Sequence, residues 1–215
     1  MPLFPKTTWG AVRRWTDWPR QFRLLGRHLR YGAASFARKD SEMKVRVLAE
    51  VFRGVNTHLR SLGVDYALGY GTLLGWHREK RILPHDYDID FIAPVEAYPA
   101  IRDSAATLPT GFTLHDTSYR HFGPKLYVSY RGWEADIYFL RTEGANLRST
   151  EDCVNPGDVA PFPREFFYPL QSVEFLGEPT FVPAKPFDLL TLHYGYLGPN
   201  AVRDPVTRLF KPRQR

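Results

Sequence analysis

The chain has 215 residues, enough for one domain with a complete hydrophobic core. Its single cysteine, Cys153, excludes an intramolecular disulfide framework and a cysteine-based zinc site. No apolar run approaches the roughly 20 residues of a membrane-spanning helix, and the N-terminus lacks the continuous apolar segment of a signal peptide. The sequence therefore predicts a cytoplasmic protein.

The net charge of +6 is concentrated at the two ends of the chain. Residues 1–40 hold nine Lys/Arg and two acids, and residues 203–215 hold five Lys/Arg and one acid. Residues 41–202 hold fifteen Lys/Arg against twenty acids, so the body of the protein is mildly acidic. An acidic body argues against nucleic acid as the partner.

The N-terminal segment, residues 1–39, mixes arginine with tryptophan, phenylalanine and leucine at a roughly helical spacing. This pattern suits a helix that lies on an anionic membrane surface, and it equally suits a helix packed on the domain with its arginines in water. We expect a catalytic domain over residues 40–200, followed by a basic tail over residues 201–215.

The first half of this domain alternates helices with short strands. Apolar residues at i, i+3 and i+4 predict a core helix to about residue 62. A strand is expected over 64–70, and a glycine-rich turn then opens a second helix over 71–78. An acidic strand is expected over 85–93, followed by a helix over 95–108.

The second half is dominated by hairpin patterns. Strands are predicted over 125–130 and 133–140, and a second hairpin over 170–183. A short helix is predicted over 187–194, and residues 144–169 have the composition of a long surface loop or lid. The fold class predicted from this order is α/β or α+β with a mixed sheet flanked by helices.

Three carboxylates, Asp86, Asp88 and Asp90, stand at alternate positions just before an apolar run. Alternate side chains of a strand share one face, so we expect the three to point the same way. Asp136 sits in the middle of another apolar strand, and it would join them if the two strands are neighbours. Carboxylates so close together repel one another, and a bound Mg²⁺ or Mn²⁺ ion is the simplest way to offset that repulsion. Alternatively, these aspartates line an exposed edge strand and pair with nearby arginine and lysine side chains.

A glycine-rich turn, Gly69-Tyr70-Gly71-Thr72, precedes the acidic strand in the sequence. Small residues let the backbone approach a ligand closely, and the N–H groups at a helix N-terminus favour phosphate. The turn and the carboxylates together predict a site for a phosphate-containing substrate and a metal ion.

The sequence resembles the nucleotidyltransferase superfamily of polymerase-β type, and within it the LicD/fukutin family. The resemblance covers about residues 64–195, and it is strongest over the Gly-Thr-Leu-Leu-Gly turn and the Asp-x-Asp-x-Asp run. Further on, Lys125 and Asp136 match a lysine segment and an acidic strand of the family. The positions that match the central motif are Gly71, Thr72, Leu73, Leu74, Gly75, Arg78, Pro84, Asp86, Asp88 and Asp90.

The resemblance implies a catalytic role for all four aspartates and a metal site made by Asp88, Asp90 and Asp136. Asp136 or Asp86 would accept the proton of the attacking hydroxyl, and Asp136 is the favoured choice. The other matching side chains and backbone groups would bind substrate phosphate; these are Gly71, Thr72, Arg78 and Lys125.

The family resemblance implies a metal-dependent phosphotransferase. A phospho-alcohol would pass from a CDP-linked donor, such as CDP-choline or CDP-ribitol, to a hydroxyl of a glycan, and CMP would leave. We expect a lipid-linked precursor of a cell-surface glycan (lipopolysaccharide, capsule or teichoic acid) as acceptor, with residues 1–39 docking the enzyme on the inner face of the membrane. The alternatives are transfer of a nucleoside monophosphate from an NTP, and a non-enzymatic membrane adaptor with a structural ion site.

Overall fold

A computed structural model describes residues 42–150 and 160–213 of the chain. The chain divides after Ser41 into two units, and only the second lies within the described range. The prediction of a helical, membrane-binding segment over residues 1–39 therefore falls outside the described residues, as does Cys153. None of the described helices is long and apolar enough to cross a membrane.

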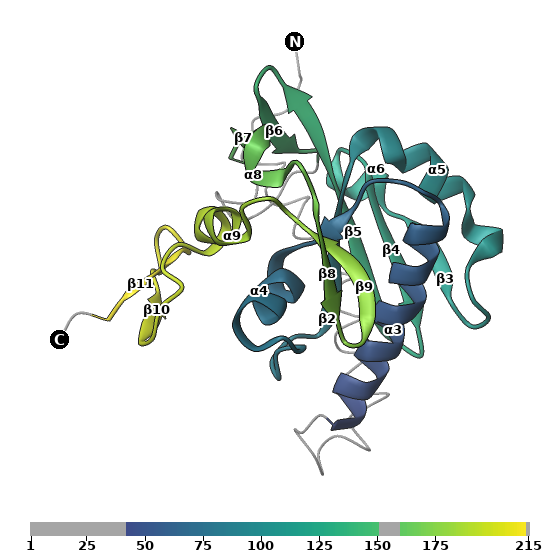
Figure 1. The fold of residues 1–215 in the computed structure, drawn as a ribbon, viewed down its shortest axis with the longest axis horizontal. Helices are drawn as coiled ribbons and strands as arrows, with labels where there is room; N and C mark the ends of the chain where they lie inside the picture. Colours follow the sequence, from purple (N-terminus) through teal and green to yellow (C-terminus); the bar gives the residue numbers. More distant parts are fainter. Residues whose placement is uncertain (1–41, 151–159, 214–215) are drawn as a thin grey trace, which may run out of the picture. The chain divides into compact units, whose positions relative to one another are not determined.

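The centre of the domain is a mixed sheet with the strand order β1-β2-β5-β4-β3 (Figure 1). β2 and β5 are parallel, whereas the other neighbours in this path pair antiparallel. β6 pairs with the C-terminal part of β5, and β7 pairs with β6. The strands are β1 (Ala67–Leu68), β2 (Asp88–Pro94), β3 (Thr113–Asp116), β4 (Lys125–Tyr130), β5 (Trp133–Glu143), β6 (Asn146–Ser149) and β7 (Phe162–Pro163).

One face of this sheet is apolar and forms the core. Ile89 and Phe91 of β2 and Ile137 of β5 point to this face and are fully buried. The long helix α3 (Glu42–Ser61) packs against β2, β4 and β5, and Figure 1 shows it running alongside β4 and β5. The Phe52 ring of α3 stacks on Phe91 with a centroid distance of 6.1 Å. The predicted helical stripe is confirmed as the wall of this core.

The opposite face of β2 and β5 carries the acidic side chains, and a second group of elements lies at that side. Helix α4 (Tyr70–Glu79) packs on β2, and α9 (Pro186–Tyr194) packs on α4. Two smaller hairpins pair β8 (Gln171–Phe175) with β9 (Glu178–Val182), and β10 (Ala201–Arg203) with β11 (Phe210–Pro212). The β8–β9 hairpin belongs to the apolar side instead, since β9 packs on α3 and β1. The expected basic tail over 201–215 therefore contains a hairpin within its described part.

Glycine at two positions lets α4 sit close to its neighbours. A Cβ on Gly75 would lie 2.5 Å from the backbone oxygen of Arg81, and a Cβ on Gly69 would lie 2.6 Å from Ile92 Cγ1. Real Cβ atoms essentially never approach so closely. The two glycines allow the turn before α4 to pack on β2 and the chain after α4 to fold back over it.

The helix predicted over 95–108 is instead broken into η1 (Val95–Ala97), α5 (Tyr98–Asp103) and η2 (Ala105–Thr107). The hydroxyls of Ser104 and Thr107 donate to backbone carbonyls three residues earlier, and such bonds compete with a continuous helix. The prediction of a long surface loop or lid over 144–169 is also wrong where the chain is described. That range contains β6, β7 and the short helix α8 (Arg164–Phe167).

The acidic strand begins at Asp88, so the prediction that Asp86 shares its regular alternation is wrong. The Asp86 N–H donates to the Leu83 carbonyl across 3.0 Å, which holds Asp86 in the turn before β2. The preceding predicted strand is similarly shortened to Ala67–Leu68, because pairing with β2 stops there and Tyr70 adopts a φ of 38°.

Candidate active site

Three carboxylates converge on the polar face of β2 and β5. The parallel register places Asp90 directly opposite Asp136, and Asp88 lies two residues before Asp90 on the same face. Within the described part of the chain, each of the three offers an oxygen within 4.8 Å of the other two. This confirms the prediction that the two acidic strands are neighbours.

Burial makes it costly in free energy to keep these carboxylates ionised. Asp90 and Asp136 are each 6 % exposed. Loss of hydration raises the pKa of Asp90 well above its usual value, and the nearby charges of Asp88 and Asp136 raise it further. A divalent cation favours the ionised form of such a cluster, and hard carboxylate oxygens are the ligands that Mg²⁺ and Mn²⁺ prefer. The three aspartates therefore fit a metal ion.

The turn before α4 is tied directly to Asp90. The Gly71 N–H donates to Asp90 Oδ2 across 3.1 Å, and the Asp90 N–H donates to Thr72 Oγ1 across 2.9 Å. A Cβ on Gly71 would lie 3.1 Å from Asp86 Oδ1. Thr72 is 2 % exposed, and its hydroxyl supports the strand. The proposed contact of this turn with phosphate stays a prediction.

Lys125 is a buried cation beside the acids. Its side chain is 2 % exposed, and its Nζ lies 3.4 Å from Asp136 Oδ2 and 2.8 Å from the centroid of the Tyr138 ring. The Nζ makes no hydrogen bond to the described residues. The charge of Lys125 lowers the pKa of Asp90, but burial and the charges of Asp88 and Asp136 raise that pKa by more. An ammonium so placed supplies positive charge to the carboxylate group from within the protein.

The remaining predicted residues lie at different distances from this group. Asp86 is close to the turn, since its Oδ1 would meet a Cβ on Gly71. Its Oδ2 is buried and accepts no hydrogen bond from the described residues, and burial raises its pKa. Arg78 lies seven residues beyond Gly71 in α4, about 10 Å along the helix axis, and donates to the Leu197 carbonyl across 2.5 Å.

Aromatic side chains surround the acids in a way that sequence reasoning missed. The Tyr70 ring lies between Tyr138, at 4.5 Å, and His193, which stacks on it at 4.7 Å. The Tyr138 hydroxyl donates to Asp136 Oδ2 across 3.2 Å. Burial lowers the pKa of His193 to about 4, so its ring is neutral near pH 7. The alternation of Asp136 and Tyr138 on β5 was the available signal for Tyr138, whereas nothing local connects Tyr70 with His193.

Several known proteins share features with this chain. The family model described as LicD/FKTN/FKRP, nucleotidyltransferase domain, matches residues 63–185. The ribitol-5-phosphate transferases FKTN of Macaca fascicularis and Homo sapiens are each 27 % identical to this chain over 150 residues. That alignment covers 64 % of this chain and 30 % of either relative, so the chain matches less than a third of their length.

Solved structures with a similar trace have low sequence identity. ANT(2″)-Ia in complex with adenylyl-2″-tobramycin has a TM-score of 0.45 and 11 % identity, over 63 % of this chain and 68 % of that one. The lincosamide antibiotic adenylyltransferase LnuA, lincomycin-bound, has a TM-score of 0.38 and 15 % identity, over 73 % and 87 %.

The mixed sheet, the glycine turn before α4 and the acids on β2 and β5 define a domain of the nucleotidyltransferase class. Because the family model matches more than half of its residues, the chain belongs to the LicD/FKTN/FKRP family. The predicted family and fold class are both confirmed.

Proposed function

We propose that this protein is a metal-dependent phosphotransferase. It moves a phospho-alcohol from a CDP-linked donor to a hydroxyl of a glycan or lipid-linked glycan, and CMP leaves. The observation that carries the proposal is the cluster of half-buried Asp88 with buried Asp90 and Asp136, in a family member whose relatives are ribitol-5-phosphate transferases. Phosphoryl transfer needs charge neutralisation and in-line positioning more than covalent chemistry, and a cluster of carboxylates that can hold a cation supports the first requirement.

Asp88, Asp90 and Asp136 hold Mg²⁺ or Mn²⁺ in this proposal. An ion held there would supply positive charge to offset the charge of the donor diphosphate. Lys125 holds Asp136 in place through its 3.4 Å ion pair, and its burial argues for this role over a direct contact with substrate. Asp136 or Asp86 accepts the proton of the attacking hydroxyl.

The backbone N–H groups at the start of α4, at Gly71 and Thr72, bind the phosphate of the departing CMP in this proposal, which requires that the Gly71 N–H exchange Asp90 Oδ2 for a phosphate oxygen. Arg78 also binds phosphate, which requires that its guanidinium exchange the Leu197 carbonyl for the donor. The basic residues of segment 1–39 dock the enzyme on an anionic membrane surface in the cytoplasm. Deletion of residues 1–39 is expected to abolish sedimentation with phosphatidylserine vesicles, and undiminished sedimentation would disprove that docking.

The test is release of CMP from CDP-ribitol and CDP-choline in the presence of a glycan acceptor, measured by mass spectrometry with Mn²⁺ or with EDTA, together with the matching mass gain of the acceptor. A parallel reaction with each of the four NTPs measures pyrophosphate. We expect Mn²⁺-dependent CMP release and no pyrophosphate. Pyrophosphate without CMP would instead identify a transferase of nucleoside monophosphates.

A variant pair ties the activity to the acids. The Asp88→Asn/Asp90→Asn double variant is expected to lose CMP release and the electron paramagnetic resonance signature of bound Mn²⁺. Asp103→Asn is the matched control, because that carboxylate pairs with Arg102 on the exposed surface. Turnover that persists in the folded double variant would overturn the proposed chemistry. Loss of the fold in that variant would favour a structural ion site.

A further inference from the structure

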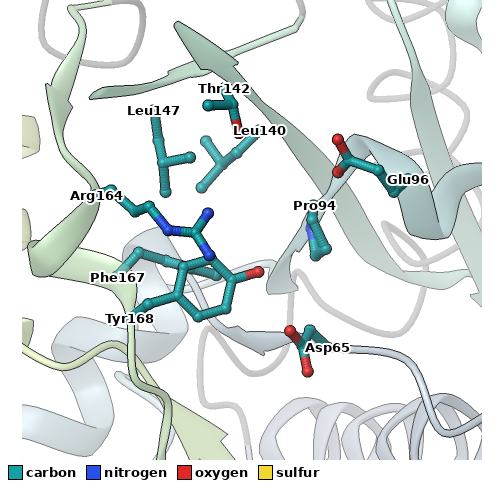
Figure 2. A pocket seen from close by; sticks show the side chains of 9 residues that line it. All are labelled: Asp65, Pro94, Glu96, Leu140, Thr142, Leu147, Arg164, Phe167 and Tyr168. Atoms are coloured by element: carbon teal, nitrogen blue, oxygen red, sulfur yellow. The ribbon is translucent and has the colours of Figure 1, made fainter. Parts of the chain in front are cut away.

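A hollow lies away from the carboxylate group, toward the C-terminal ends of β2 and β5. Its volume is about 280 Å³. Figure 2 shows Arg164 and Tyr168 on one side of this hollow, and Pro94, Glu96 and Asp65 on the other. These five residues come from three separate parts of the chain, so the hollow exists only in the folded domain. We call it the distal hollow.

The distal hollow and the carboxylates share one face of the sheet. Asp90 and Pro94 lie four residues apart on β2, and Asp136 and Leu140 lie four residues apart on β5. Each pair of side chains therefore points to the same face. Pro94 and Leu140 line the distal hollow, and they lie four residues, about 13 Å, beyond the acids along their strands. A substrate longer than a single ring is needed to occupy both places.

The distal hollow combines an apolar floor with a polar rim. Leu140, Leu147 and Phe167 form the floor and are each at most 4 % exposed. The rim offers the carboxylates of Asp65 and Glu96 as hydrogen-bond acceptors, and across from them it offers donors, the Arg164 guanidinium and the hydroxyl of Thr142.

We propose that the distal hollow binds a neutral sugar unit of the acceptor, at a distance from the hydroxyl that reacts. The proposal rests on the proposed glycan-modifying function. Sugar hydroxyls both donate and accept, which suits a rim with both kinds of group, while the C–H faces of a sugar ring suit the apolar floor. The volume is close to the lower limit of small-ligand sites, as expected for one ring.

Other ligand classes fit the distal hollow less well. Two carboxylates face one guanidinium, so the net charge of the rim disfavours phosphate or a nucleotide. The Arg164 guanidinium already lies 4.3 Å from the centroid of the Tyr168 ring, so a cationic ligand meets a positive charge on that aromatic face. Burial, and then the neighbouring charge of Asp65, raise the pKa of Tyr168 to about 12, so its hydroxyl stays a donor at neutral pH.

A wider hollow adjoins the distal one and extends the path. It shares Asp65 and Tyr168 with the distal hollow, has a volume of about 590 Å³, and continues along Pro169 and Phe181. A glycan chain that places one unit in the distal hollow therefore has room for its next unit on the side away from the acids.

The test is binding of small sugars without turnover. Saturation-transfer difference NMR on the full chain uses the methyl pyranosides of glucose, galactose, mannose and N-acetylglucosamine as probes. We expect at least one of the four sugars to bind. Glu96→Gln and Asp65→Asn are each expected to raise the Kd of that sugar about tenfold, the effect of one lost hydrogen bond to a charged group. Glu165→Gln is the control, because Glu165 lies on α8 beside Arg164 but pairs with Lys185.

Three results would overturn the proposal. These are no binding by any of the four sugars, sugar binding that is unchanged in both folded rim variants, and rim-dependent binding of tetramethylammonium or inorganic phosphate instead of a sugar. The Asp88→Asn/Asp90→Asn variant is expected to bind the sugar normally. If CMP release fails while binding that depends on Glu96 persists, the proposed reaction falls and the saccharide site stands.

Discussion

Replacing Lys125 by methionine tests whether this buried ammonium balances the charge of the carboxylate group. The substitution keeps a long, unbranched side chain and removes only the positive charge. The Asp136 side chain, 9 % exposed, then loses its ion-pair partner at 3.4 Å, and Asp90 loses the charge that lowers its pKa. We expect the metal-free protein to lose stability and to gain more from added metal than the wild type does.

The magnitude follows from the geometry. Two unit charges 3.4 Å apart attract each other by about 5 kcal/mol at an effective dielectric constant of about 20. Removing one partner of a buried ion pair typically costs about 3–5 kcal/mol, because the other charge stays buried and uncompensated. For a domain of this size, such a loss lowers the Tm by roughly 10 °C.

Thermal unfolding followed by circular dichroism, with EDTA or with saturating Mn²⁺, measures both effects. The surface variant Lys185→Met is the control, since its exposed pair with Glu165 is worth at most about 1 kcal/mol. Lys125→Met/Asp136→Asn, which removes both charges, is expected to lose less stability than Lys125→Met. The reasoning is refuted if Lys125→Met melts with the wild type in EDTA, or if Mn²⁺ stabilises the two proteins equally.

Three further predictions concern the surroundings of the site. Since burial lowers the pKa of His193 from 6.5 to about 4, only the unfolded state takes up this proton as the pH falls through that window. Between pH 6.5 and 4, urea titrations should show the wild type losing on the order of 3 kcal/mol relative to His193→Phe, a comparison in which the opposite contribution of buried Asp90 is common to both proteins. Gly75→Ala forces a Cβ against the Arg81 backbone oxygen and should cost about 1–3 kcal/mol in urea unfolding; an unchanged midpoint contradicts the close packing. Arg78→Ala should speed hydrogen exchange around Leu197 and raise the KM for the CDP-linked donor, and an unchanged KM would leave Arg78 with only its structural contact.

Local sequence patterns were enough to predict most of the elements. The spacing of apolar residues predicted α3, and the two β-rich runs on either side of Arg131-Gly132 predicted β4 and β5, whose turn residues both have positive φ. The motif residues also predicted the family, because the Gly-Thr-Leu-Leu-Gly turn and the aspartate run are close together in the sequence.

The sequence by itself determined the candidate site residues: alternating acids, a glycine turn and an acid in the middle of an apolar strand. Only the tertiary structure decided how they meet, because strand pairing depends on contacts between distant parts of the chain. The parallel register of β2 and β5 sets Asp90 opposite Asp136, and a backbone hydrogen bond to Leu83 takes Asp86 out of the strand. The tertiary structure also buries Lys125 beside Asp136, a pairing that no local pattern predicted, while its contact with phosphate stays a prediction.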